Sequence, residues 1–138
     1  MKNILLWLWQ LPQHLLALIL WGILRVADKV DSVKKSDDGG PRWLITTNTP
    51  SWGISLGHYI LMDNHYTPKD WKHEYGHSRQ SLYLGPLYLP VIGIASAVFN
   101  NLWDRLFHKK WDGKRRIKWY YSRYPEDWAD RLGGVVRG

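Results

Sequence analysis

The sequence has no cysteine among its 138 residues. This absence excludes disulfide scaffolds, thiolate zinc knuckles and cysteine nucleophiles together. Acidic residues are also scarce, since 12 Asp and Glu stand against 19 Lys and Arg and leave a net charge of +7. Only two of these acids, Glu74 and Glu126, are glutamates. A chain of this length is expected to form one compact domain with a single modest core.

Tryptophan, by contrast, is abundant and accounts for ten of the residues. A basic chain favours anionic partners, which are either nucleic acids or the headgroups of a membrane. Trp and Tyr suit a membrane–water boundary, and they also stack on single-stranded nucleic acid. The order of residues along the chain has to decide between these partners.

Residues 4–26 form an apolar run of 23 residues that is interrupted by a polar notch, which consists of Gln10, Pro12, Gln13 and His14. About 20 apolar residues span a bilayer as a helix. We therefore expect residues 1–27 to form a membrane-anchor helix, either transmembrane or interfacial. A secretory signal and a buried helix of a soluble core are the alternatives. Residues 28–42 are polar and are expected to be a linker to a single domain at 43–138.

The start of that domain favours β-structure. Residues 43–47 and 53–62 are rich in β-branched and aromatic residues, with Asn48-Thr49-Pro50 between them. This pattern predicts two strands joined by a turn, which is a short antiparallel β-hairpin.

A helix is predicted after the hairpin. Thr67-Pro68-Lys69-Asp70 combines a capping hydroxyl, a proline at the first helical position and an acid in the first turn. The helix should begin near Pro68 and end at about Leu84, where Gly85-Pro86 stops it.

The remaining chain contrasts an uncharged segment with a basic one. Residues 82–99 carry no charge and contain Pro86, Pro90 and Gly93, which predict a broken pair of hydrophobic helices lying shallowly in the membrane. Residues 105–118 are strongly basic and should lie at anionic headgroups, facing the cytoplasm. Acids after Pro125 and a closing pair of glycines predict a short terminal helix.

The predicted helix from Pro68 carries the motif His73-Glu74-Tyr75-Gly76-His77. Positions i and i+4 share one helix face, so both imidazoles can reach one metal ion. A catalytic Zn²⁺ takes three protein ligands and keeps one position for water, and a glutamate beside the first histidine can accept the proton of that water. A chance match in a chain of this composition is expected about 0.004 times, so the motif is a strong signal.

A third ligand is required, and several residues compete for the role: His14, His58, His65, His108 and the acids. Glu126 is favoured because it opens Glu126-Asp127-Trp128-Ala129-Asp130 on the predicted terminal helix. Glu126 and Asp130 are again i and i+4 on one face, so one can bind the metal while the other holds a ligand in place. The competing interpretation makes Glu126 an ordinary acid at a helix N-terminus.

These two motifs together resemble the gluzincin metallopeptidases, and most closely the membrane-bound HtpX and CAAX prenyl protease branch. The chain is also similar to small bacterial membrane proteins with an HEYGH core and a terminal WADxLGG, here HEYGHSRQSLYLGPLYL (73–89) and WADRLGG (128–134). The resemblance implies that one zinc ion is bound by His73, His77 and Glu126. It also implies that Glu74 is the general base and that Asp130 accepts a hydrogen bond from a ligand histidine, most readily His73.

The fold that follows is α+β and mainly helical, with a minimal zincin-like core. The expected activity is hydrolysis of peptide bonds in a peptide or protein substrate, at a bacterial inner membrane. An oxyanion partner is also needed, and four residues are candidates: Tyr121, Tyr124, His58 and His65. Two other functions are weighed: a non-catalytic membrane protein or interaction module that zinc only stabilises, and a nucleic-acid binder using 105–124. The uncharged segment argues against the nucleic-acid binder.

Overall fold

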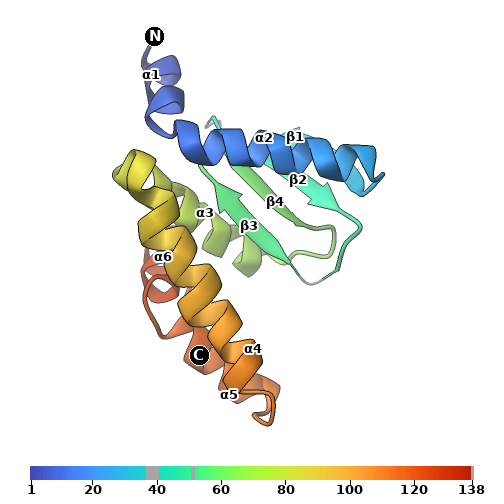
Figure 1. Ribbon diagram of the computed structural model, residues 1–138, viewed down its shortest axis with the longest axis vertical. Helices are drawn as coiled ribbons and strands as arrows, with labels where there is room; N and C mark the ends of the chain where they lie inside the picture. The colour runs from blue at the N-terminus through green and yellow to red at the C-terminus, as the bar shows by residue number, and fades with distance from the viewer. Residues whose placement is uncertain (37–40, 51, 138) are drawn as a thin grey trace.

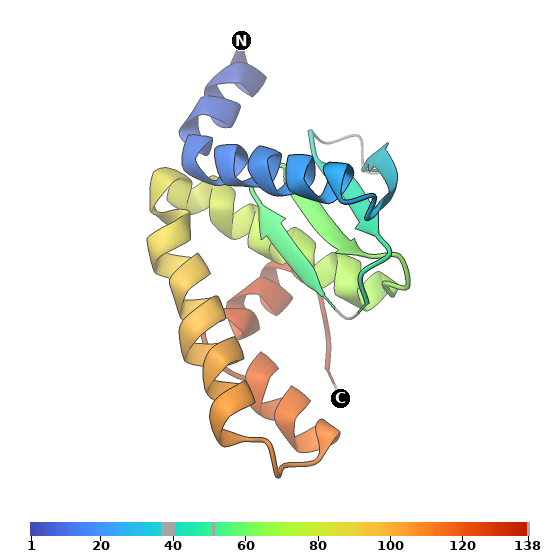
Figure 2. The ribbon, with the colours of Figure 1, turned by 45° about the vertical axis from the view of Figure 1, so that its right-hand side comes forward.

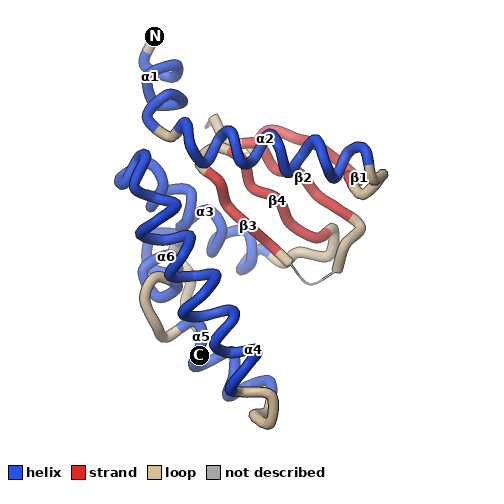
Figure 3. Tube along the Cα trace, in the orientation of Figure 1, coloured by secondary structure: helices blue, strands red, loops and turns tan. Residues whose placement is uncertain are grey.

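A four-stranded mixed sheet lies at the centre of the computed structural model, which describes residues 1–36, 41–50 and 52–137. Its strands are β1 (Val30–Lys35), β2 (Trp43–Thr47), β3 (Gly53–Leu56) and β4 (Tyr59–Asp63), in the spatial order β1-β2-β4-β3 (Figure 3). The β1–β2 and β3–β4 pairs are antiparallel, whereas β2 and β4 are parallel. The chain is thus α+β and mainly helical, as expected.

The predicted pairing of the hairpin was wrong. Segment 53–62 is not one strand, because Gly57 and His58 form a turn that separates β3 from β4. Gly57 has a φ of +69°. Glycine at the first position of a two-residue turn is typical of tight β-hairpins. The antiparallel hairpin is therefore β3–β4, and β4 lies parallel to β2 instead of folding back on it.

The predicted linker at 28–42 contains strand β1, which also corrects the sequence-based expectation. β1 pairs along β2 from Val30 opposite Thr47 to Lys35 opposite Trp43. Most of its residues are exposed, and it forms the outer edge of the sheet. An edge strand that carries lysines and faces water has no clear alternation of apolar and polar residues, so its sequence resembles a linker.

The N-terminal run forms two helices instead of one. Helices α1 (Lys2–Trp9) and α2 (Leu11–Val26) meet at an angle of 81° (Figure 1). Among the described residues, no single helix has the length and apolar character needed to cross a bilayer, and these two pass that test only as a bent pair. The expectation of one anchor helix over 1–27 is corrected accordingly.

The polar notch in this run explains the bend, since its side chains are buried inside the protein. Gln10, Gln13 and His14 are all fully buried. Gln13 Nε2 donates to Ser81 Oγ at 2.7 Å, and Ser81 Oγ donates to Gln10 Oε1 at 2.7 Å. These hydrogen bonds attach the N-terminal helices to the helix that contains Ser81, so the polar residues serve the packing of the protein interior.

Helices cover both faces of the sheet. Leu44, Ile60 and Met62 form the core cluster, against which Trp71 of α3 (Pro68–Leu84) packs. The alternate residues of β2 and β4 point to the opposite face. Figures 1 and 2 show α2 across that face and α3 behind the sheet. Both faces are covered, which is why the central residues of β2 and β4 are buried on both sides of the sheet.

Helix α3 has the predicted limits and caps. Thr67 accepts a hydrogen bond from the Asp70 amide, and the Asp70 side chain accepts one from the Thr67 amide, which completes a capping box. The helix ends at Leu84 because Gly85 adopts a φ of +55°. A Cβ at Gly85 would also lie 2.1 Å from the ring of Trp9, so only glycine fits there.

After Gly85 the chain stays helical through residue 107, and we call this segment the rod. It comprises η1 (Gly85–Leu87), η2 (Leu89–Gly93), η3 (Ala95–Leu102) and α4 (Trp103–Phe107), and it runs as one element in Figure 2. The predicted break at Gly85-Pro86 is present, but the predicted break at Pro90 was wrong. Pro90 lies in the first turn of η2, where its missing N–H interrupts no helical ladder.

Two short helices complete the chain: α5 (Gly113–Tyr121) and α6 (Glu126–Gly133). The terminal helix was predicted, and Gly134 ends it in the left-handed conformation with a φ of +75°. Helix α6 packs closely on α3, since a Cβ at Gly76 would lie 1.8 Å from the carbonyl oxygen of Ala129. This contact brings the start of α6 to the middle of α3.

Candidate metal centre

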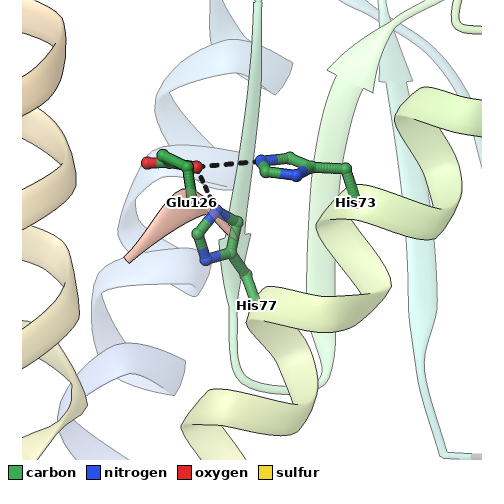
Figure 4. A group of neighbouring side chains, drawn as sticks. All are labelled: His73, His77 and Glu126. Atoms are coloured by element: carbon green, nitrogen blue, oxygen red, sulfur yellow. Dashed lines mark hydrogen bonds and ion pairs between the residues drawn. The ribbon is translucent and has the colours of Figure 1, made fainter. Parts of the chain in front are cut away.

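Three side chains converge where α3 meets α6 (Figure 4). His73 and His77 project from successive turns of α3, and Glu126 is the first residue of α6. Glu126 Oε2 lies 2.9 Å from Nε2 of His73 and 2.9 Å from Nε2 of His77. All three residues are buried, with exposed fractions of 5%, 6% and 1% respectively. The two motifs that were separated in the sequence therefore meet at one point.

The other nitrogen of each imidazole is held by an oxygen. His73 Nδ1 lies 2.7 Å from Asp130 Oδ1, and His77 Nδ1 lies 2.7 Å from Gln80 Oε1. A carboxylate or amide oxygen at Nδ1 fixes the proton there and leaves the lone pair on Nε2. Both Nε2 atoms are therefore oriented to bind a metal. The hydrogen bond expected between His73 and Asp130 is present.

These supporting residues are themselves held in place. Arg137 donates to both oxygens of Asp130, at 2.6 and 3.0 Å, and Gln80 Nε2 donates to the Pro125 carbonyl at 3.0 Å. The Gln80 amide thus joins His77 of α3 to the residue that precedes Glu126. On the other side, the Ser96 hydroxyl of the rod donates to Glu126 Oε1. Helices α3 and α6 and the rod together orient the donor atoms.

The charges of the cluster are strongly coupled. Burial disfavours the His73 cation, but hydrogen bonds to Asp130 and Glu126 outweigh burial and raise its pKa to about 9. Burial likewise opposes the His77 cation, yet the charge of Glu126 raises its pKa. Burial would raise the pKa of Glu126, but the two histidines hold it well below its usual value. In the metal-free protein these interactions therefore favour the ionised carboxylate of Glu126 and the cationic forms of His73 and His77.

Glu74 lies beside the three donors in a different environment. It is buried, and loss of solvent raises its pKa above the usual value for a glutamate. Its Oε2 atom has no hydrogen-bond partner among the described residues. Its Oε1 atom lies 3.0 Å from the position that a Cβ would take on Gly53 of β3. Glycine at that position leaves room for the carboxylate against the edge of the sheet.

A cavity of about 1060 Å³ opens at this cluster. Its walls come from the edge strand β3, from α3, from the rod, and from α5 and α6. The residues that line it include His73, Glu74, His77 and Glu126. A space of this size accommodates a peptide segment or a small molecule.

The donor set fits a zinc ion. The three ligand atoms lie within 4.8 Å of one another, and two imidazole nitrogens with one carboxylate oxygen are a common catalytic zinc set. Tetrahedral bonds of about 2.0–2.1 Å separate ligand atoms by about 3.3 Å. The present contacts of 2.9 Å need to lengthen only slightly to admit the ion. The unpartnered Glu74 oxygen is the kind of buried atom that a bound water would satisfy.

Of the predicted oxyanion residues, only Tyr121 is at the site. Its ring meets the His73 ring edge-on at a centroid distance of 5.0 Å. Tyr124 is half exposed and packs on Trp128 at 6.5 Å. His65 is exposed and lies outside the lining of the cavity.

The other histidines weighed as ligands also lie away from the metal centre. The rings of His58 and His14 meet at a tilt, with centroids 4.7 Å apart, beside Gln10, and His108 stacks on Trp111 at 3.6 Å. Gln80, Ser96 and Arg137 were not predicted from the sequence as residues of the site. Gln80 follows His77 by three residues and shares its helix face, so this spacing was the one sequence signal that could have indicated their contact.

Comparisons of the chain with protein-family models, with curated proteins and with solved structures returned no match. A functional assignment therefore depends on the residues and on their geometry.

Proposed function

We propose that this protein is a zinc-dependent hydrolase of peptide bonds. The observation that carries the proposal is the position of Glu74. It is a buried carboxylate with an unpartnered oxygen, next to a His73–His77–Glu126 donor set and on the wall of the same cavity. A structural zinc site usually has four protein ligands. The candidate cluster contains three among the described residues, which favours a catalytic site over a purely stabilising one.

Zinc bound there supplies a Lewis acid that polarises a carbonyl and lowers the pKa of water towards about 7. The protein supplies the proton acceptor. Burial raises the pKa of Glu74, which makes its carboxylate a stronger proton acceptor than that of an ordinary glutamate. Glu74 accepts a proton from the attacking water and delivers it to the leaving amine.

Tyr121 is the remaining oxyanion candidate. Burial raises its pKa to about 12, so the phenol keeps its proton and can donate a hydrogen bond to a developing negative charge. Its ring meets the edge of His73 and the residue lines the cavity, and both observations support this role.

The edge of β3 offers a position for the substrate backbone. The Trp52 carbonyl accepts a hydrogen bond from the Asp63 amide of the neighbouring strand. Backbone groups alternate in direction along an antiparallel pair, so those of Gly53 and Ser55 point away from β4. The Ser55 carbonyl is occupied by the Tyr88 hydroxyl at 2.7 Å. Gly53 remains available to an extended peptide beside Glu74.

The test is a comparison of three variants with the native chain in zinc content and in cleavage of a fluorogenic peptide library. Glu74→Gln should keep its zinc and lose at least about 100-fold in activity, because only the proton acceptor is removed. Glu126→Ala should lose both zinc and activity. Asp127→Asn is the matched control, since this carboxylate is next in sequence but lies outside the cavity lining. Full activity in the Glu74→Gln variant would refute the mechanism.

A further inference from the structure

Two helical segments expose apolar side chains to solvent without any charge among them. Residues 3–24 and 80–103 contain no Asp, Glu, Lys or Arg. On α2, Ile19 and Ile23 are 61% and 60% exposed. On the rod, Leu87 and Phe99 are 58% and 60% exposed. Large apolar side chains that are exposed together on one surface mark an interaction surface and not an ordinary solvated face.

These two segments flank the same opening. Figures 1 and 2 show α2 and the rod on the near side of the molecule, with β3 between them. Three side chains line the cavity of the metal cluster and are also exposed at its rim: Leu16 of α2, with Ile94 and Val98 of the rod. The mouth of the cavity is therefore bordered by the exposed apolar residues. We call α2, the rod and this rim the apolar face.

Cations stand at the ends of the apolar face. Lys2 is the first residue of α1, Arg25 lies in the last turn of α2, and Lys29 follows α2. Arg105 and Lys109 lie near the end of the rod. All five side chains are exposed. The first acidic residue in the chain is Asp28, so the N-terminal helices contain none.

We propose that the apolar face is the docking surface for a lipid bilayer that contains anionic lipids, and that the mouth of the cavity opens onto the bilayer. Uncharged helices edged by cations match an apolar lipid interior bounded by negatively charged headgroups. A second copy of the chain would have to place the same cations against each other, because a symmetric interface joins like surfaces. The proposal depends on the surface residues and stands whether or not the cluster hydrolyses peptides.

The experiment uses the full chain and vesicles of phosphatidylcholine, with or without phosphatidylglycerol. Sedimentation measures the bound fraction, and quenching of tryptophan fluorescence by lipids with brominated chains measures insertion. We expect binding that is stronger with phosphatidylglycerol and weaker at high salt, with quenching by the brominated chains. Protein that stays in the supernatant with both kinds of vesicle overturns the proposal.

Two substitutions identify the surface. Ile19→Asp and Phe99→Asp each place a charge on the apolar face and should weaken vesicle binding by roughly tenfold or more. Val136→Asp is the matched control, since Val136 is 85% exposed on the C-terminal tail and its variant should bind like the native chain. Circular dichroism checks that each variant is folded, and the quenching of the native chain is independent of the variants.

Two other outcomes would also contradict the proposal. If Ile19→Asp and Phe99→Asp bind vesicles as well as the native chain, the apolar face is not the docking surface. If the native chain is a dimer in sedimentation equilibrium, and both substitutions dissociate the dimer without changing vesicle binding, the face is covered by a second copy.

Discussion

Replacing Gly76 by Ala tests whether the close crossing of α3 and α6 holds the metal centre together. A Cβ at this position would lie 1.8 Å from the Ala129 carbonyl oxygen, whereas real Cβ contacts are essentially never shorter than 3.0 Å. The oxygen belongs to the backbone of α6, so the helix as a whole has to move. Glu126 begins the same helix and would move away from the two histidines of α3.

The expected magnitude follows from two opposing effects. Overpacking costs about 1–3 kcal/mol, and contact with a backbone atom puts this substitution near the upper end. Alanine is about 1 kcal/mol better than glycine inside a helix, which offsets part of that cost. The net loss of about 2 kcal/mol corresponds to a fall in Tm of about 7 °C for a domain of this length. Zinc affinity should fall by roughly tenfold or more, since metal–ligand distances tolerate only about 0.2 Å.

The assay is thermal unfolding followed by circular dichroism, together with zinc titration against a chelating dye. Gly22→Ala is the matched control, because a Cβ at Gly22 of α2 meets no atom within 4 Å. That variant should gain about 1 kcal/mol, or about 3 °C in Tm, and should bind zinc normally. If Gly76→Ala instead unfolds at the native temperature and binds zinc equally well, the packing argument is refuted.

Two further predictions concern the metal-free charges and the N-terminal packing. The pKa of His73 is raised from 6.5 to about 9, so the stability that its protonation contributes is full below about pH 6.5 and is lost as the pH rises through 9. Urea unfolding in EDTA between pH 6 and 10 should show this decline, and Asp130→Asn should flatten the pH profile. An unchanged profile in that variant would contradict the pairing of His73 with Asp130. Gln13→Ala leaves Ser81 without its buried donor and should cost about 2 kcal/mol in urea unfolding. Leu15→Ala, on the exposed side of the same helix, should cost less than about 1 kcal/mol. Equal losses of stability in the two variants would show that Gln13 does not attach α2 to α3.

The helices that carry the metal cluster could be predicted because their signals are local. The Thr67–Asp70 capping box and Pro68 mark the start of α3 within four residues, and Gly85 marks its end. The i, i+4 spacing of His73 and His77 depends only on the helix in which they lie. Such signals do not require any knowledge of what the helix packs against.

The sheet could not be predicted to the same extent. Strand β1 is mostly exposed and lacks an alternating pattern, so its pairing with β2 is decided by contacts across the sheet. Segment 53–62 is rich in apolar and aromatic residues on both sides of Gly57, so its sequence reads as one strand and does not indicate the parallel pairing of β4 with β2. The burial of Gln10 could not be predicted for a similar reason, because it depends on a helix more than 70 residues away along the chain.

The sequence by itself determined the chemistry of the candidate site: two imidazoles one helical turn apart, a glutamate between them, and a second acidic motif on a separate helix. Only the tertiary structure decided that Glu126 meets both imidazoles. It also decided that Ser96 of the rod holds the carboxylate and that Arg137 holds Asp130. The physical reason is the separation along the sequence over which each interaction acts. Local spacing follows from the geometry of one helix, whereas the meeting of distant side chains depends on how closely α3 and α6 can approach, and Gly76 sets that distance.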